Sequence, residues 1–245
     1  MESIPTEKPA VEAQSEEPIA IRPILADAWQ IYRQQFKVIA AVAGAVWLPC
    51  DLLSSYFDAF VFGPDNFRAS FKLTQFLDNF IGIIATAGVI FIALSSRSGQ
   101  AVTFRNAMAA GFSSWGRMWW SRLLSGFVLL VTTVFFILPG LYFATRFCFI
   151  EVLVVAECIS GKKAMVRSLE LTRDRFGQAF LLCLTIALLW IVPYILILCI
   201  SVMGNWLTEA AGQFATDLLF AFTIVAFYCA YERYAKACKP SAELK

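Results

Sequence analysis

The residues of this sequence best suited to chemistry are charged side chains that stand inside or beside long apolar runs. They are Arg146, Glu151, Asp51, Asp58 and Asp217. A charge in the middle of an apolar layer costs roughly 2.5 to 3.5 kcal/mol, so it either pairs with another charge or marks a path for an ion or polar solute. These residues are our candidate polar site within the apolar region.

The partners of these charges can be narrowed from their spacing. Arg146 and Glu151 are five residues apart, which puts them on different faces of a helix. We therefore expect Arg146 to pair with a carboxylate of another apolar run, and Asp51, Asp58 and Asp217 are the candidates. Two interpretations stay open. Salt bridges could lock the helices together, with Arg146 extending outward and Glu151 protonated, or the charges could line a polar site or cation path.

A second group of polar residues lies around the segment GKKAMVRSLELTRDRF, residues 161–176. It comprises Glu157, Arg167, Ser168 and Thr172. The segment predicts a helix with one apolar and one charged face, and Arg167 is placed to bond Glu157 across the turn before it. A basic helix of this kind also rests on anionic lipid headgroups, so both interpretations are kept.

Residue types that support catalysis are scarce. Histidine is absent, which excludes histidine triads and histidine general bases. The seven cysteines form no C-x-x-C pair and lie mostly in apolar runs, where cysteine acts as a small hydrophobic residue. No H-E-x-x-H, G-x-S-x-G or glycine-rich phosphate-binding pattern occurs. We therefore expect no enzyme, no metal and no cofactor.

The composition indicates the environment that surrounds these residues. The apolar fraction is 59% and the charged fraction 16%, well away from the balance of soluble domains. Residues 178–208 contain no charge, and this run exceeds the roughly 20 residues that cross a bilayer. The net charge of +2 gives no indication of a nucleic-acid partner. We predict an all-α, polytopic membrane helical bundle.

The apolar runs define the expected elements. Residues 1–20 are polar and aperiodic and predict a disordered tail, residues 21–238 a membrane domain, and residues 239–245 a basic tail. We expect Pro49 to kink the first span, residues 62–75 to form a loop, and Pro139-Gly140 to form the turn of the central hairpin. The domain should contain about six transmembrane helices, approximately at residues 38–57, 79–95, 121–137, 141–159, 178–202 and 214–231.

An amphipathic segment precedes each pair of spans. The segments ILADAWQIYRQQF, AMAAGFSSWGRMW and AMVRSLELTRDRF combine apolar and basic residues as interfacial helices do. Aligned by their final aromatic residues, they share a bulky apolar residue seven places earlier, Trp29, Phe112 and Leu169. This pattern indicates a threefold repeat, or else the basic flank that any such hairpin carries.

Lysine and arginine concentrate in alternate connections, and this bias predicts orientation. The two connections that follow the third and fifth spans contain neither, and the one after the first span contains only Arg68 and Lys72. The remaining connections and tails are basic. We therefore expect both termini in the cytoplasm, with anionic headgroups on that side as partners and no nucleic acid bound.

One local pattern resembles a known family. Pro139-Gly140, Tyr142, Arg146 and Glu157 are followed by further matching residues, Ala164, Arg167-Ser168, Leu171-Thr172 and Phe176. This order resembles the membrane domain attached to some bacterial glycerophosphodiester phosphodiesterases and its stand-alone relatives, the YciC-like inner-membrane proteins. The resemblance implies a bacterial inner-membrane location and no catalysis, because the namesake's activity belongs to a separate soluble barrel. The family usually has a proline near the position of Glu151.

Two functions follow from these observations. The first is a non-enzymatic scaffold or envelope-maintenance protein with membrane-protein partners or a second copy of itself. The second is a small transporter or lipid-handling protein that uses Arg146, Glu151 and Asp51. A water-filled cavity that reaches Glu151 from one side would favour the second, and a closed, fully packed bundle the first.

Overall fold

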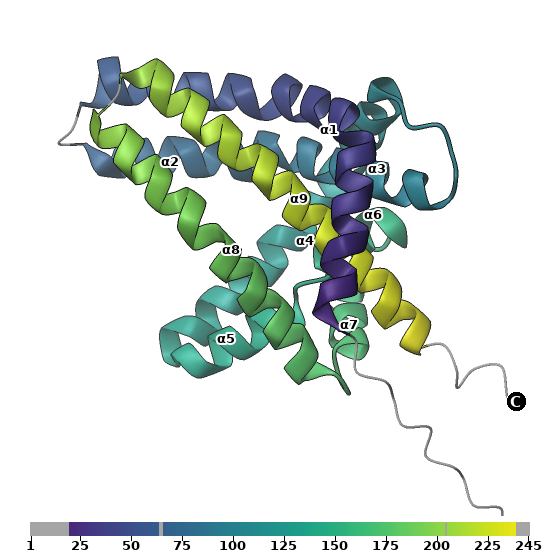
Figure 1. The fold of residues 1–245 in the computed structure, drawn as a ribbon. Coiled ribbons are helices and arrows are strands. Elements are labelled where there is room, and N and C mark those ends of the chain that lie inside the picture. The colour runs from purple at the N-terminus through teal and green to yellow at the C-terminus, as the bar shows by residue number, and fades with distance from the viewer. Residues whose placement is uncertain (1–19, 64–65, 204, 239–245) are drawn as a thin grey trace, which may run out of the picture.

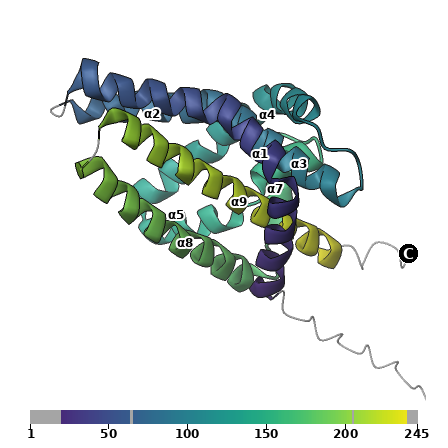
Figure 2. The ribbon, with the colours of Figure 1, turned by 45° about the horizontal axis from the view of Figure 1, so that its top comes forward.

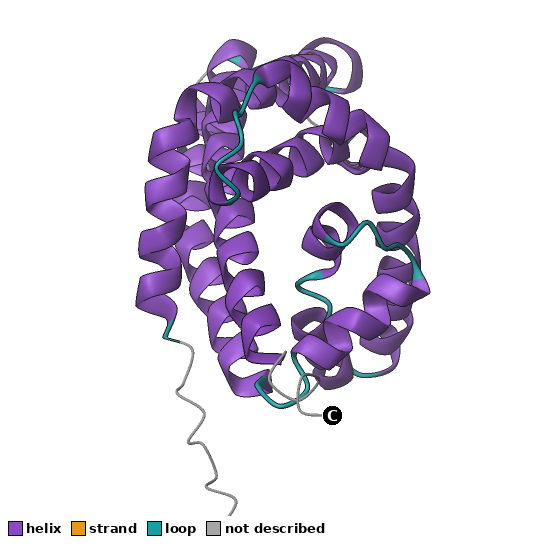
Figure 3. Ribbon diagram, turned by 90° about the vertical axis from the view of Figure 1, so that its right-hand side faces the viewer, coloured by secondary structure: helices purple, strands orange, loops and turns teal. Residues whose placement is uncertain are grey.

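The protein is almost entirely helical. The computed structural model describes residues 20–63, 66–203 and 205–238, and in these ranges it contains helices and no strand, as Figure 3 shows. The all-α prediction is confirmed. The tails predicted over residues 1–20 and 239–245 lie outside the described residues, apart from Ala20.

The chain begins with one long helix. Helix α1 (Ile21–Phe57) joins the expected interfacial segment to the first span without interruption and continues into the π-helix η1 (Asp58–Phe62). Pro49 lies inside α1 and does not end it. In Figures 1 and 2 the ribbon of α1 changes direction part-way along its length. The amphipathic part and the apolar part are therefore one continuous element.

The loop predicted between the first two spans is wrong for most of its length. Residues 67–75 belong to helix α2 (Phe67–Leu77), which passes through a second π-helix, η2 (Asp78–Gly82), into α3 (Ile83–Arg97). The polar residues of α2 recur at helical spacing, so they fit one face of a helix as well as they fit a loop. The second membrane-crossing stretch accordingly covers residues 68–97.

The central hairpin turns earlier than expected. Helix α4 (Phe104–Phe135) is separated from α5 (Ile137–Arg146) by the single residue Phe136. Pro139-Gly140 lies in the first turn of α5, where proline is tolerated. The Pro-Gly turn prediction is therefore wrong. An added Cβ at Gly140 would collide with Thr133, so the glycine allows α4 and α5 to approach closely.

The fourth span is broken. Three residues separate α5 from the short helix α6 (Ile150–Ala156), and α7 (Lys162–Leu171) then begins after Gly161, whose φ is +58°. Helix α8 (Phe176–Met203) is bent by 105° from α7, and α9 (Trp206–Cys238) returns along α1. Figures 1 and 2 show the tip between α8 and α9 beside the end of α1.

Helices α1, α3 and α9 make most of the core. Side chains such as Ile39, Val89 and Val225 are fully buried there. The α4–α5 hairpin instead exposes large apolar side chains, with Ile137 78% and Leu138 80% exposed. Within the described residues five helical stretches are long and apolar enough to cross a membrane, and the bent pair of α7 and α8 makes a sixth if it is one span. The chain is therefore a multi-pass membrane protein whose exposed apolar surface suits lipid.

Ion pairs connect the ends of the core helices α1, α3 and α9. Asp27 near the start of α1 accepts from Arg97 at 3.1 Å and from Arg233 at 2.8 Å, and Arg97 also reaches Glu232 at 3.1 Å. The start of α1 and the ends of α3 and α9 therefore meet at one end of the bundle, which we call the charged end.

Candidate binding site within the membrane

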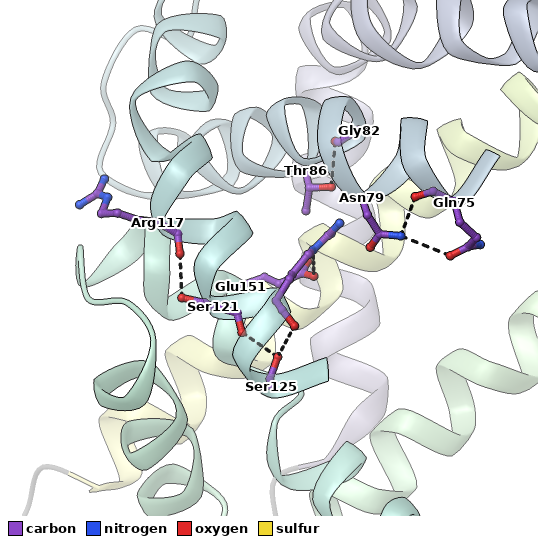
Figure 4. A network of polar contacts seen from close by, with 9 residues as sticks. Gln75, Asn79, Gly82, Thr86, Arg117, Ser121, Ser125 and Glu151 are labelled. Atoms are coloured by element: carbon purple, nitrogen blue, oxygen red, sulfur yellow. Dashed lines mark hydrogen bonds and ion pairs between the residues drawn. The ribbon is translucent and has the colours of Figure 1, made fainter. Parts of the chain in front are cut away.

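An ion pair between α4 and α6 lies at the centre of the candidate site. Arg122 Nε donates to Glu151 Oε1 at 2.7 Å. Ser125 Oγ donates to the carbonyls of Ser121 and Arg122, which ties this turn of α4 together (Figure 4). Glu151 occupies the first turn of α6, where the helix dipole also favours a negative charge. The pair was not predicted from the sequence, because Arg122 stands at the edge of the predicted span 121–137 and is 29 residues from Glu151.

A cavity of about 310 Å³ reaches Glu151. Its walls come from α3, α5, α6, α8 and α9 and from the turn between α5 and α6, and they are mainly apolar. The polar or polarisable groups at its surface are Glu151, Thr223 and the thiols of Cys148 and Cys183. Small-molecule sites have this character, apolar walls with a few polar groups that set orientation.

A second cavity lies on the other side of the ion pair. It measures about 220 Å³ and is lined by Arg122, Asp78, Asp217 and Thr86, among others. Phe220 lines both cavities. Since Arg122 faces the second cavity and Glu151 the first, the ion pair forms part of the partition between them. Asp78 was not among the residues we selected from the sequence, because it stands at the polar edge of its apolar run.

Two of the three predicted aspartates come together. The carboxyl groups of Asp51 on α1 and Asp217 on α9 are in contact, and Asp78 on η2 lies near enough to act on both. Asp51 is only 9% exposed. Asp58 is placed elsewhere, at the start of η1, and one of its carboxylate oxygens is buried with no hydrogen-bond partner among the described residues. Asp58 therefore does not belong to this site.

Among the described residues, Arg146 pairs with no carboxylate, so the predicted pairing with Asp51, Asp58 or Asp217 is wrong. Its Nη1 donates to the carbonyl of Thr172 at 3.2 Å, and the guanidinium lies 5.5 Å from the ring centroid of Tyr142. Thr172 follows the last turn of α7, whose unpaired carbonyls and dipole favour a cation. A helix terminus therefore takes the place of the expected aspartate. The buried Nε atom of Arg146 has no hydrogen-bond partner among the described residues.

Ser168 and Thr172 join Arg146 in one cluster. Ser168 Oγ donates to the carbonyl of Arg146 at 2.6 Å, and Thr172 Oγ1 donates to the carbonyl of Ser168 at 2.8 Å. Both side chains are fully buried. Tyr142 and Phe176 pack with ring centroids 5.1 Å apart. The residues of the sequence pattern thus hold α7 against the end of α5, and we call them the signature cluster.

The contact between Arg167 and Glu157, one of the two interpretations kept for this segment, is present in the structure. Arg167 Nε lies 3.5 Å from Glu157 Oε2, and Arg167 also reaches Glu170 on its own helix at 3.3 Å. Glu157 accepts a second hydrogen bond from Tyr231 of α9 at 2.8 Å. Helix α7 is therefore tied to α6 and α9, while Lys162 and Lys163 in its first turn remain exposed.

The site's chemistry consists of charge pairing and apolar enclosure. Over residues 20–63, 66–203 and 205–238, no three His, Cys, Asp or Glu side chains are placed to hold a metal ion together. The described residues thus form a multi-pass helical membrane protein in which an ion pair, a carboxyl pair and two cavities lie close together. In comparisons with known proteins, no family model matches the chain, and no curated protein or solved structure is significantly similar to it.

Proposed function

We propose that this protein is a lipid-handling membrane protein that binds an amphipathic molecule inside the bundle. The observation that carries the proposal is the cavity of about 310 Å³ whose surface includes the carboxylate of Glu151. An internal cavity at this residue is the feature that favours a transporter or lipid-handling role over a scaffold alone.

The walls of the cavity select the class of ligand. Side chains such as Phe147, Phe220 and Phe227 give it an apolar surface suited to acyl chains or other hydrocarbon. Glu151 accepts hydrogen bonds, so it selects a headgroup with donors, such as an ammonium or a hydroxyl. The volume is at the lower end of the roughly 300 to 1,000 Å³ of ligand pockets. The ligand is therefore enclosed in part, with its remainder in the bilayer.

The surroundings of the site complete the proposal. The protein resides in a bacterial inner membrane with both termini in the cytoplasm, in keeping with the family resemblance and the distribution of basic residues. Lys162 and Lys163 on the exposed face of α7 bind anionic headgroups on that side. No catalytic role is assigned, since the chain contains no histidine and no catalytic sequence pattern was found.

A scaffold role is the second candidate, and one observation favours it. The α4–α5 hairpin carries large exposed apolar residues, including Val134, Phe135 and Ile137, each more than 70% exposed. Such a surface gives a partner helix or a second copy of the chain area for packing.

Native mass spectrometry of the purified protein tests the lipid-handling proposal. The protein is extracted with mild detergent, and the lipid that stays bound is compared among variants. Cys183→Phe fills the cavity, and Leu184→Phe places the same aromatic side chain at the neighbouring, 42% exposed position of α8. We expect wild type and Leu184→Phe to retain one lipid, and Cys183→Phe and Glu151→Gln to lose at least nine-tenths of it.

The same experiment separates the two candidates. Equal lipid retention by all variants would refute the cavity as the binding site. Loss of a stoichiometric protein partner or of a dimer on substituting Phe135 by serine, with lipid retention unchanged in every variant, would assign the scaffold role instead.

A further inference from the structure

Asp51 and Asp217 form an isolated carboxyl pair inside the bundle. Asp51 belongs to α1 and Asp217 to α9, and their carboxyl groups are in contact. Asp51 is 9% exposed, and its Oδ2 atom is buried with no hydrogen-bond donor from the described part of the chain. Two carboxylates in contact repel each other unless something placed between them carries positive charge.

The charged groups around the pair compensate for it only in part. Asp78 on η2, a third carboxylate, acts on both Asp51 and Asp217. Arg122 on α4 lines the same cavity as Asp217 and Asp78, but its Nε donates to Glu151 on α6.

Neutral neighbours do not compensate for the charges. Ser54 of α1 bonds Thr74 of α2 at 2.7 Å, and Ser55 donates to Gln213 of α9 at 3.5 Å. These hydroxyls are therefore directed to partners other than the carboxyl pair. Within the described residues, no hydrogen-bond donor reaches the buried Oδ2 atom of Asp51.

We propose that Asp51 and Asp217 share a single proton and form a proton-binding site within the membrane. One proton turns the contact into a hydrogen bond, with one carboxyl group as donor and the other as acceptor. A divalent metal is a poorer occupant, because the described residues offer no third ligand at this place. The site binds a proton whether or not the protein handles lipid.

The position of Asp217 links this proton to the cavities. Asp217 lines the second cavity together with Asp78 and Arg122. When the proton leaves, the added negative charge attracts Arg122 toward this cavity and weakens its hold on Glu151. Glu151 lines the first cavity, so the proton regulates the proposed lipid site. This regulation, unlike the proton site, rests on the proposed function.

Infrared difference spectroscopy of the full-length protein in lipid nanodiscs tests the proton site. The carbonyl stretch of a protonated carboxyl group is recorded in light and heavy water as pH rises. We expect a band equivalent to one carboxyl group in wild type. Asp51→Asn, Asp217→Asn and the double variant should each lose that same band completely, because the pair holds one proton. Glu170→Gln, an exposed carboxylate of α7, is the matched control and should keep it.

The outcomes decide between a shared proton and its alternatives. Half of the lost intensity in each single variant and all of it in the double variant would mean two independent acids and would overturn the proposal. An ionised pair whose carboxylate bands shift with sodium or potassium would make the site a monovalent cation site and would also overturn it. Wild-type titration alone distinguishes these results if a variant fails to fold. Lipid retention is not measured here, so this test can fail while the lipid-handling proposal stands.

Discussion

Separating Arg122 from Glu151 is the most informative perturbation of the site. At 2.7 Å between Nε and Oε1, unit charges attract by about 6 kcal/mol at an effective dielectric constant of about 20. Desolvation offsets much of this attraction. The side chain of Arg122 is 22% exposed and that of Glu151 is 34% exposed. Removing one partner of a buried pair costs about 3 to 5 kcal/mol, and the partial exposure places this pair at about 3 kcal/mol.

The two single variants should differ in cost. Arg122→Met leaves Glu151 and the nearby Asp78 without a cation, so we expect a loss of about 3 kcal/mol in the free energy of unfolding. Glu151→Leu leaves Arg122 with Asp78 still near it, so the loss should be about 1 to 2 kcal/mol. The double variant replaces the whole ion pair by apolar groups. Its free energy of unfolding should be less than about 1 kcal/mol below that of Glu151→Leu, the milder single variant.

Equilibrium unfolding in mixed micelles measures these differences. The fraction of denaturing detergent is raised, helical circular dichroism is followed, and the free energy is extrapolated to zero denaturing detergent. The cycle should give a coupling energy of about 2 kcal/mol. The matched control is the pair of Arg167 and Glu170 on the surface of α7, where a coupling of about 0.3 kcal/mol is expected. Strictly additive single variants, or a larger cost for Glu151→Leu than for Arg122→Met, would refute the reasoning.

Three further predictions follow from other parts of the structure. An added Cβ at Gly111 would lie 2.5 Å from a carbonyl oxygen of α3, so Gly111→Ala should cost about 2 kcal/mol of unfolding free energy. Gly116→Ala meets nothing within 4 Å and should leave stability unchanged or slightly raised in the same assay. Ser168→Ala removes the hydrogen bond to the Arg146 carbonyl and should cost about 1 kcal/mol, with cysteine in its place recovering little. Cys238 is exposed at the end of α9, so an impermeant maleimide should label it in inside-out vesicles and not in right-side-out vesicles.

The helical class of the protein could be predicted from its long apolar runs and few charges. In a chain of this length, these two features together indicate an all-α membrane bundle. The boundaries were harder. The amphipathic segments before the first and third spans continue into α1 and α4, because nothing in their sequence stops a helix at the headgroup level. Pro139 suggested a turn, yet proline fits the first turn of α5 equally well, and the chain reverses at Phe136.

The candidate site was predictable only where its partners lie close in sequence. Arg167 and Glu157 are separated by one short turn, and their contact was predicted. Arg122 and Glu151 stand 29 residues apart on different helices, so only the packing of α4 against α6 brings them together. The acceptor of Arg146 is a backbone carbonyl, which every residue possesses. The residue types in a sequence therefore do not indicate which backbone carbonyl will accept a hydrogen bond from an arginine.

The break between α5 and α6 has a consequence for how the protein is made. Helix α5 has ten residues and is about 15 Å long, half of the roughly 30 Å hydrocarbon layer, so it cannot cross alone. Glu151 finds Arg122 already synthesised when it emerges. Arg146 instead depends on Thr172, which follows it by 26 residues. The insertion machinery must therefore retain the nascent hairpin until α7 has emerged, and a chain that stops before Thr172 should be recognised by quality-control proteases.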